Sequence, residues 1–218
     1  MLFLFLQTLI NLMSLFLHFL FGFFFSFTGS ITPSMLNITA LKVSLEKNKK
    51  QANFYSLGVS LIVSFQVYIA IVLTKYVTEN PSILESLEKA GTVLFIILSV
   101  YFFKQSKSKK EQINANKNRK GNSFLSGIIL SILNMFSIPF FCGVIASLEM
   151  FNLMSFDKFP VTFFIIGSTI GTFCILFLYG KYANFIQKKT GKLTKDISLI
   201  LSIITGSVAV FMLIKNVF

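Results

Sequence analysis

Long apolar stretches dominate the hydrophobic pattern of this sequence, and shorter polar or charged connections separate them. A helix needs about 20 apolar residues to cross the roughly 30 Å hydrocarbon core of a bilayer. Most of the stretches reach or approach that length, so the pattern predicts an all-α integral membrane protein with about six transmembrane helices. The apolar segments are residues 2–45 with an interruption, 52–74, 86–103, 122–148, 160–180 and 197–214.

The first apolar segment is too long to be one straight span. Residues 1–41 contain no Asp, Glu, Lys or Arg, and a straight helix of that length would measure about 60 Å. Pro33 stands in the polar run 28–34, and a proline inside a helix removes a hydrogen-bond donor and clashes with the preceding turn. A similar run in the fourth segment, 134–139, ends in Pro139. We therefore expect interruptions in helices 1 and 4.

The composition agrees with a membrane protein. Hydrophobic residues make up 54% of the chain and charged residues 13%, whereas soluble domains carry about 25% charged residues. The N-terminus has no basic start and no small-residue cleavage site of the kind that marks a signal peptide, so we expect it to be retained. Residues 1–14 have no counterpart in the second half of the chain, and the sequence leaves open whether they belong to the mature protein.

The charged residues lie in the connections, and their sign alternates along the chain. The first, third and fifth connections are strongly basic, whereas the second and fourth are slightly acidic. Basic connections stay in the cytoplasm, so this pattern predicts that both termini lie outside. The long basic connection, 104–120, is interpreted as a solvated cytoplasmic loop near anionic lipid. It lacks the interleaved aromatic residues that stack on bases, so the net charge of +12 does not indicate nucleic-acid binding.

The two halves of the chain resemble each other. Each half contains three predicted spans, and because three is odd, the second half must enter the membrane from the opposite side. This gives an inverted 3+3 repeat, an architecture typical of secondary transporters. We expect one transmembrane domain, 1–218, with repeats at about 15–104 and 122–218 and a cytoplasmic loop at about 104–121. The matches, in order, are Gly22-Phe-Phe-Phe-Ser26 with Gly127-Ile-Ile-Leu-Ser131, Gly58 with Gly167, and 90–93 with 205–208.

Polar residues near the two interruptions mark a candidate substrate site. Backbone groups freed by a broken membrane helix need a partner in protein, water or substrate, and a half-helix that begins near Pro33 would attract a carboxylate to its N-terminus. Gln66 lies mid-span, where an unpaired amide is costly. The alternatives are simple proline kinks and amides that only bond neighbouring helices. The candidate substrate-binding residues are Thr32, Pro33, Ser34, Asn37, Gln66, Asn134, Ser137 and Pro139.

The motifs of common enzyme classes are missing from the sequence. There is no HExxH, Walker or Gly-x-Ser-x-Gly motif, and no Asp or Glu lies deep within a predicted span. Cys142 and Cys174 are interpreted as buried small side chains, because a disulfide or metal pair has no supporting His or Cys cluster. His18 is interpreted as a tolerated helix residue, although an ionisable group in a membrane segment is also a candidate functional group. We therefore expect no enzymatic activity, no cofactor and no metal site.

The residues around both interruptions resemble the LysE/RhtB superfamily of amino-acid exporters. Residues 29–45, followed by a basic turn and Gly58, are similar to the superfamily's first block, which carries a Pro-Gly-Pro-like motif. Residues 124–141 are similar to its second block, a glycine followed by an Asn-Pro-like motif. The resemblance extends from about residue 15 to the C-terminus.

This chain departs from both motifs of the superfamily. Ser34 and Met35 follow Pro33 in place of Gly and Pro, and Met135 replaces the proline after Asn134. The resemblance thus implies a divergent branch that retains the fold and the export class, while a basic amino acid as substrate does not follow from it.

The resemblance implies a secondary exporter of amino acids or related small metabolites in the bacterial inner membrane, driven by an ion gradient. Its expected partners are a small-molecule substrate and the lipid bilayer, without nucleic acid. Two alternatives are a transporter of another solute or ion on a related fold and a non-transporting membrane scaffold. The scaffold gives the paired interruptions no purpose. The substrate, the coupling ion, the direction of transport and the oligomeric state, homo-oligomers included, stay open.

Overall fold

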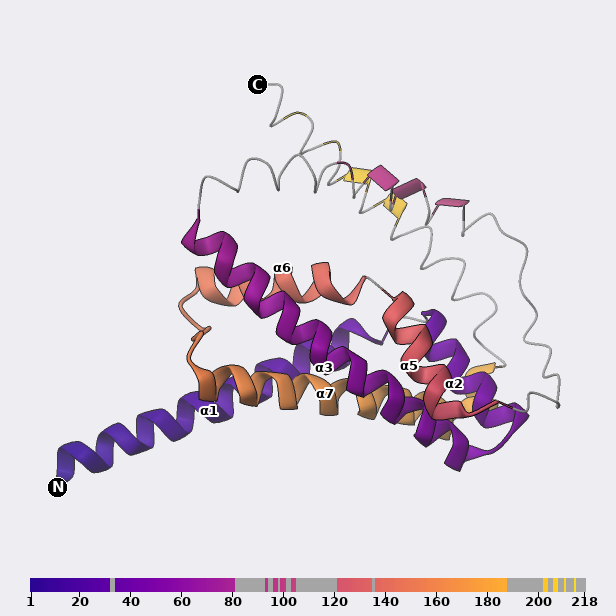
Figure 1. Cartoon of the computed structure of the whole chain (residues 1–218), viewed down its shortest axis with the longest axis horizontal. Coiled ribbons are helices and arrows are strands. Elements are labelled where there is room, and N and C mark those ends of the chain that lie inside the picture. The colour runs from indigo at the N-terminus through magenta and orange to yellow at the C-terminus, as the bar shows by residue number, and fades with distance from the viewer. Residues whose placement is uncertain are drawn as a thin grey trace. The chain divides into compact units, whose positions relative to one another are not determined.

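Every element with assigned bounds in the computed structural model is a helix (Figure 1). The structure describes residues 1–31, 34–80, 93, 96, 97, 99, 100, 103, 104, 121–134, 136–187, 202, 203, 206, 207, 210 and 214, and no strand occurs among them. The predicted all-α class is confirmed for this part of the chain. The helices are α1 (Leu2–Gly29), α2 (Met35–Glu46), α3 (Lys49–Glu79), α5 (Ser123–Leu133), α6 (Ser137–Met150) and α7 (Lys158–Lys181).

The chain divides into two compact units. The first consists of Met1–Tyr76 and Ala115–Ala183, and the second of Val77–Asn114 and Asn184–Phe218. Each unit therefore takes segments from both predicted repeats. In the second unit, the hydroxyl of Ser99 donates to the carbonyl oxygen of Ser202 at 3.2 Å, and the hydroxyl of Ser202 donates to that of Ser99 at 3.1 Å.

Several helices of the first unit are suited to a membrane. Phe5–Gly29 within α1, α3 and α7 are each long and apolar enough to cross one, and α5 with α6 forms a fourth candidate span with a 64° bend. The prediction of a chain that crosses the membrane several times agrees with these helices. The predicted spans 86–103 and 197–214 lie largely outside the described residues, so the total of six stays a prediction.

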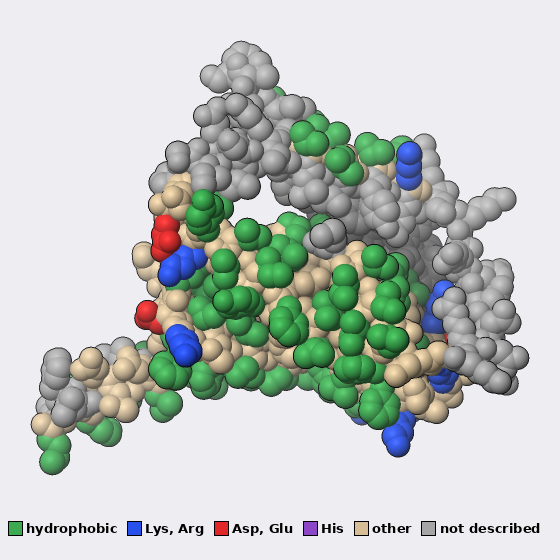
Figure 2. All heavy atoms as spheres, viewed as in Figure 1, with side chains coloured by type: hydrophobic (Ala, Val, Ile, Leu, Met, Phe, Trp, Pro, Cys, Tyr) green, Lys and Arg blue, Asp and Glu red, His purple; other side chains and the backbone are tan. Residues whose placement is uncertain are grey.

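The surface of these helices also fits a lipid environment. Side chains on the outer face of α3, such as Phe65, Tyr68 and Ile69, are exposed although they are large and apolar. Figure 2 shows hydrophobic side chains over the middle of one face of the first unit and charged side chains toward its two ends. An apolar band between charged ends matches a hydrocarbon layer between two polar interfaces.

Both predicted interruptions are present. α1 ends at Gly29, and α2 begins after Ser34, whose hydroxyl accepts from the N–H of Asn37. α5 ends at Leu133 and α6 begins at Ser137. Pro139 is thus the third residue of α6 rather than part of the break. A proline is tolerated in the first helical turn because N–H groups there have no partner within the helix.

Glycines bring α1 and α7 into close contact. A Cβ atom on Gly22 would overlap the carbonyl oxygen of Phe164, and one on Gly167 would overlap the carbonyl oxygen of Phe19. Small residues of this kind let helix backbones approach in a membrane. Any larger residue at either glycine would push the two helices apart.

The crossing of α3 and α5 repeats this arrangement in register. Here a Cβ on Gly127 would overlap the carbonyl oxygen of Tyr55, and one on Gly58 would overlap that of Phe124. Each of these four residues corresponds, in the alignment of the two predicted repeats, to one of the four residues in the crossing of α1 and α7. The repeat is a prediction from the sequence, and this matched geometry supports it.

A pair of serine hydrogen bonds follows the same correspondence. Ser26 on α1 donates through Oγ to the carbonyl oxygen of Ser168 on α7, at 2.7 Å. Ser131 on α5 donates to the carbonyl oxygen of Val59 on α3, at 3.4 Å. All four residues are buried, so the two crossings share a hydrogen bond as well as a backbone contact. Ser26 and Ser131 each lie in the last turn of their helix, directly before a break.

Candidate functional site

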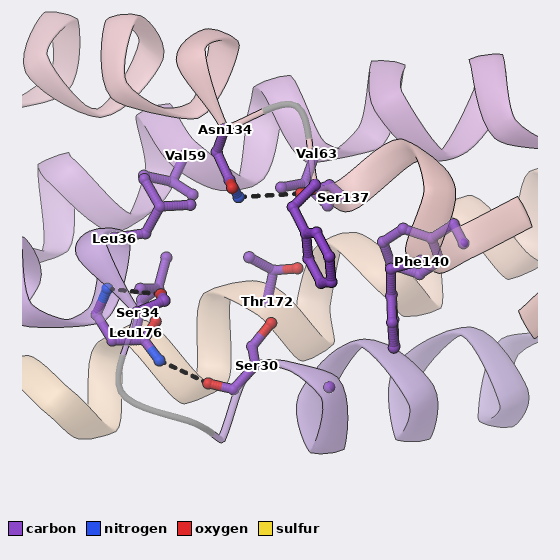
Figure 3. Close-up of a pocket in the computed structure, with 14 residues that line it drawn as sticks. Ser30, Ser34, Leu36, Val59, Val63, Asn134, Ser137, Phe140, Thr172 and Leu176 are labelled. Atoms are coloured by element: carbon purple, nitrogen blue, oxygen red, sulfur yellow. Dashed lines mark hydrogen bonds between the residues drawn. The ribbon is translucent and has the colours of Figure 1, made fainter. Parts of the chain in front are cut away.

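A cavity of about 130 Å³ lies between the two helix breaks (Figure 3). The end of α1 and the start of α2 border it on one side, and the break between α5 and α6 borders it on another, with α3 and α7 completing the wall. Its apolar lining includes Val63, Phe136 and Phe140. The polar side chains in its lining are those of Ser30, Ser34, Asn37, Asn134, Ser137 and Thr172.

Side chains donate to two of the carbonyl groups at the first break. Asn37 is buried, and its Nδ2 donates to the carbonyl oxygen of Ser30 at 2.6 Å. Tyr179 on α7 donates through its hydroxyl to the carbonyl oxygen of Ile31 at 2.7 Å. The backbone N–H of Asn37 donates to Ser34 Oγ at 3.4 Å. Protein groups thereby hold the described part of this irregular backbone, as a low-dielectric environment would require.

The second break is held in a similar way by amide side chains. Gln66 on α3 donates through Nε2 to the carbonyl oxygens of Ser131, at 2.9 Å, and Asn134, at 3.3 Å. Both carbonyls belong to the end of α5, where the regular helical donors run out. The backbone N–H of Asn134 also donates to the carbonyl oxygen of Ser131, at 3.1 Å. Asn134 in turn donates through Nδ2 to Ser137 Oγ at 3.1 Å. Gln66 Oε1 is buried and has no hydrogen-bond partner in the structure.

The predicted site residues have different positions in the structure. Four of them line the cavity together: Ser34, Asn37, Asn134 and Ser137. Gln66 is absent from the lining and contacts the end of α5 instead. Pro139 is exposed and does not line the cavity. Thr32 and Pro33 lie outside the described residues.

Sequence reasoning missed Thr172, which lines the cavity from α7 and is 4% exposed. Its hydroxyl lies 2.6 Å from Ser26 Oγ, which also donates to the carbonyl oxygen of Ser168. The polar run at 167–172 in an otherwise apolar span was the available signal. In Figure 3, Asn134 and Thr172 approach the cavity from different helices.

The cavity lining is more apolar than polar, and it carries no charged side chain among the described residues. The described residues also contain no group of His, Cys, Asp or Glu side chains suited to a metal ion. The starts of α2 and α6 both border the cavity. Because a helix N-terminus carries a partial positive charge, these two helix starts favour an anionic group. The charge is only partial, so a group with less than a full negative charge can also bind.

Polar contacts also tie the first unit together at a distance from the cavity. Lys47, just after α2, donates through Nζ to the carbonyl oxygen of Gly121 and to Ser123 Oγ, at 3.3 Å for the second. At the loop between α6 and α7, His18 Nε2 accepts from the backbone N–H of Ser155 at 2.9 Å. His18 Nδ1 lies 2.7 Å from the carbonyl oxygen of Ser14, so the buried ring has partners on both sides.

A known protein family matches the part of the chain that contains these features. The model of the LysE type translocator family matches residues 27–216, which include both helix breaks and every described residue in the lining of the cavity. No curated protein and no solved structure was found to match the chain. The family match covers most of the sequence and identifies a membrane transporter rather than an enzyme. The chain therefore belongs to the LysE type translocator family.

Proposed function

We propose that this protein is a secondary exporter of amino acids or related small metabolites across the bacterial inner membrane. The observation that carries the proposal is a cavity that both helix breaks border. Secondary transporters commonly bind substrate where broken helices meet near the bilayer midplane. Membership of a translocator family supports the transport of a small solute. The uncharged lining, an apolar surface with several hydroxyl and amide groups, supports an amino acid or a molecule of similar chemistry.

The substrate carboxylate is expected to bind where α2 and α6 begin. The hydroxyls of Ser34 and Ser137 stand at these helix starts and line the cavity, and the helix dipoles add favourable potential for an anion. Asn37 and Asn134 hold the two breaks in shape through hydrogen bonds. Gln66 supports the second break from behind, and its buried Oε1 remains available to a donor from water or substrate.

Transport then requires the cavity to open alternately to the two sides of the membrane. Ties such as the hydrogen bonds of Lys47 to Gly121 and Ser123 would have to break when access opens at that end. Uncharged serine hydroxyls suit this cycle, since a substrate that is bound too tightly could not leave. The coupling ion is expected to come from a gradient across the membrane.

An export assay with a panel of amino acids tests the proposal. Cells are loaded with one amino acid at a time. An amino acid that is a substrate of the protein is expected to leave the cells faster when they express the wild-type chain. Ser137→Ala removes a cavity hydroxyl and is expected to lower the export rate about tenfold, the effect of losing one hydrogen bond to a charged group.

The matched control is Ser147→Ala on the same helix. Ser147 bonds only the carbonyl oxygen of Gly143 and does not line the cavity, so this variant is expected to export at the wild-type rate. Equal export by both variants would remove Ser137 from the site. Failure of the wild-type chain to change the release of any amino acid would contradict the proposed function.

A further inference from the structure

The direction of two hydrogen bonds fixes what Thr172 presents to the cavity. Ser26 Oγ donates to the carbonyl oxygen of Ser168 at 2.7 Å, and a hydroxyl has one proton to give. The contact of 2.6 Å between Ser26 Oγ and Thr172 Oγ1 must therefore use the proton of Thr172. Thr172 has then no proton left for the cavity, and its Oγ1 faces a substrate only as an acceptor.

Unlike Thr172, the hydroxyls at the helix starts can still donate. Ser137 Oγ accepts from Asn134 Nδ2, and Ser34 Oγ accepts from the backbone N–H of Asn37. Each serine has therefore kept its own proton as a donor. Donors thus stand at the starts of α2 and α6, while Thr172 on α7 supplies an acceptor. Asn134 donates through Nδ2, which leaves its Oδ1 as a second acceptor.

An acceptor without a proton at Thr172 and hydroxyls that can donate at Ser34 and Ser137 match the two ends of a zwitterion. A carboxylate accepts hydrogen bonds only, and an ammonium group donates only. The two charged ends of an amino acid can therefore be distinguished by the cavity, with the carboxylate at Ser34 and Ser137 and the ammonium group at Thr172. Ser26 contributes without touching the substrate, because its Oγ accepts the hydrogen bond of the Thr172 hydroxyl and so leaves Thr172 Oγ1 as an acceptor.

The size and charge of the cavity limit the side chain of such a substrate. An apolar cavity of about 150 Å³ holds benzene, so a cavity of about 130 Å³ holds a compact amino acid better than one with a long side chain. Val63, Phe136 and Phe140 offer an apolar wall. The described lining contains no carboxylate, and an unpaired ammonium on the side chain would be costly there.

We infer that Thr172, oriented by Ser26, binds the ammonium group of a small amino acid with an uncharged side chain and thereby selects this substrate class. The inference rests on the proposed function, and it adds the substrate class and the residue that recognises the ammonium group of the substrate.

The test uses the full-length protein reconstituted into liposomes, with alanine, propionate and lysine as probes. Propionate lacks the ammonium group, and lysine adds a second one. Exchange of alanine and its inhibition by the other two compounds give their relative affinities. For the wild-type protein, alanine is expected to bind at least about tenfold more tightly than propionate, as expected for one hydrogen bond to a charged group. Lysine is expected to exchange poorly.

Three substitutions on α7 separate the role of Thr172 from a general effect on the helix. Thr172→Val removes the acceptor at nearly constant volume and is expected to weaken alanine binding about tenfold while propionate is unaffected. Thr172→Ser keeps the hydroxyl and is expected to retain selectivity. Thr169→Val is the matched control, because Thr169 bonds only the carbonyl oxygen of Ile165 on its own helix and does not line the cavity.

The outcomes distinguish the inference from the function on which it rests. Alanine exchange with unchanged affinity in a folded Thr172→Val protein overturns the role of Thr172 and leaves the proposed function standing. Lysine exchange at the rate of alanine overturns the substrate class. If no amino acid exchanges, the proposed function fails and the inference fails with it. Should Thr172→Val not fold, equal affinity of the wild-type protein for alanine and propionate overturns the inference alone.

Discussion

At the scale of single residues, amide side chains hold the irregular parts of the fold. Asn37 satisfies a carbonyl at the end of α1, and Gln66 satisfies two carbonyls at the end of α5. A buried carbonyl without a donor costs more than an average hydrogen bond contributes. These amides are therefore expected to matter for folding as well as for any contact with substrate.

The substitution Gln66→Leu tests this structural role. It removes the side-chain donor to the carbonyl oxygen of Asn134 and one of the two donors to that of Ser131, which also accepts from the N–H of Asn134. The substitution is therefore expected to lower the free energy of unfolding by about 1–3 kcal/mol. Thermal unfolding in detergent measures the change. Ser64→Ala on the same helix is the control, since Ser64 bonds only the carbonyl oxygen of Leu61. Unchanged stability with lost export would instead assign Gln66 to the substrate.

The sequence identified some of these residues more readily than others. Asn37 and Asn134 stand beside the interruptions, so their place at the cavity could be predicted. The partner of Gln66 could not, because the carbonyls that it bonds lie on a helix far away along the chain. Thr172 was missed because a threonine in a membrane helix commonly bonds a carbonyl of its own preceding turn, as Thr169 does.

At the scale of elements, two matched helix crossings position the breaks. α1 meets α7 and α3 meets α5 through glycines at corresponding positions. The polar runs predicted both breaks, but the second break precedes Pro139 and leaves that proline in the first turn of α6. A proline marks the neighbourhood of a break and not its position, because the first turn of a helix accepts it.

Substitution of a crossing glycine is expected to destabilise the bundle. Gly22→Ala and Gly127→Ala each place a Cβ against a carbonyl oxygen of the facing helix, and overpacking of this kind costs about 1–3 kcal/mol. Their midpoints of thermal unfolding in detergent should fall by similar amounts. Gly143→Ala on α6 is the control, because its Cβ would meet no atom within 4 Å. A neutral Gly127→Ala beside a destabilised Gly22→Ala would argue against equivalent crossings.

At the scale of the whole molecule, the charge pattern predicts an orientation in the membrane. The basic connections are expected in the cytoplasm and both termini outside. The tie of Lys47 to Gly121 and Ser123 would then lie toward the cytoplasm, and the tie of His18 to Ser155 toward the outside. The spans predicted at 86–103 and 197–214 complete this topology and lie largely outside the described residues.

Single-cysteine labelling from outside intact cells measures this orientation. In a background with Cys142 and Cys174 replaced, a cysteine at Ser82 or Phe156 is expected to react with an impermeant reagent, whereas one at Asn116 is not. Permeabilised cells should give labelling at all three positions, which controls for accessibility. Reaction of the Asn116 cysteine in intact cells would reverse the predicted topology.

The two crossings also dictate an order of assembly during synthesis. Each joins a helix from the first half of the chain to one from the second, as Gly22 of α1 meets Phe164 of α7 and Gly58 of α3 meets Phe124 of α5. While the ribosome is still making the second half, α1 and α3 must wait in the bilayer without their partners. Such distant contacts form late, so a chain that stalls after the first half would present unmatched glycine grooves to the quality-control proteases of the cell.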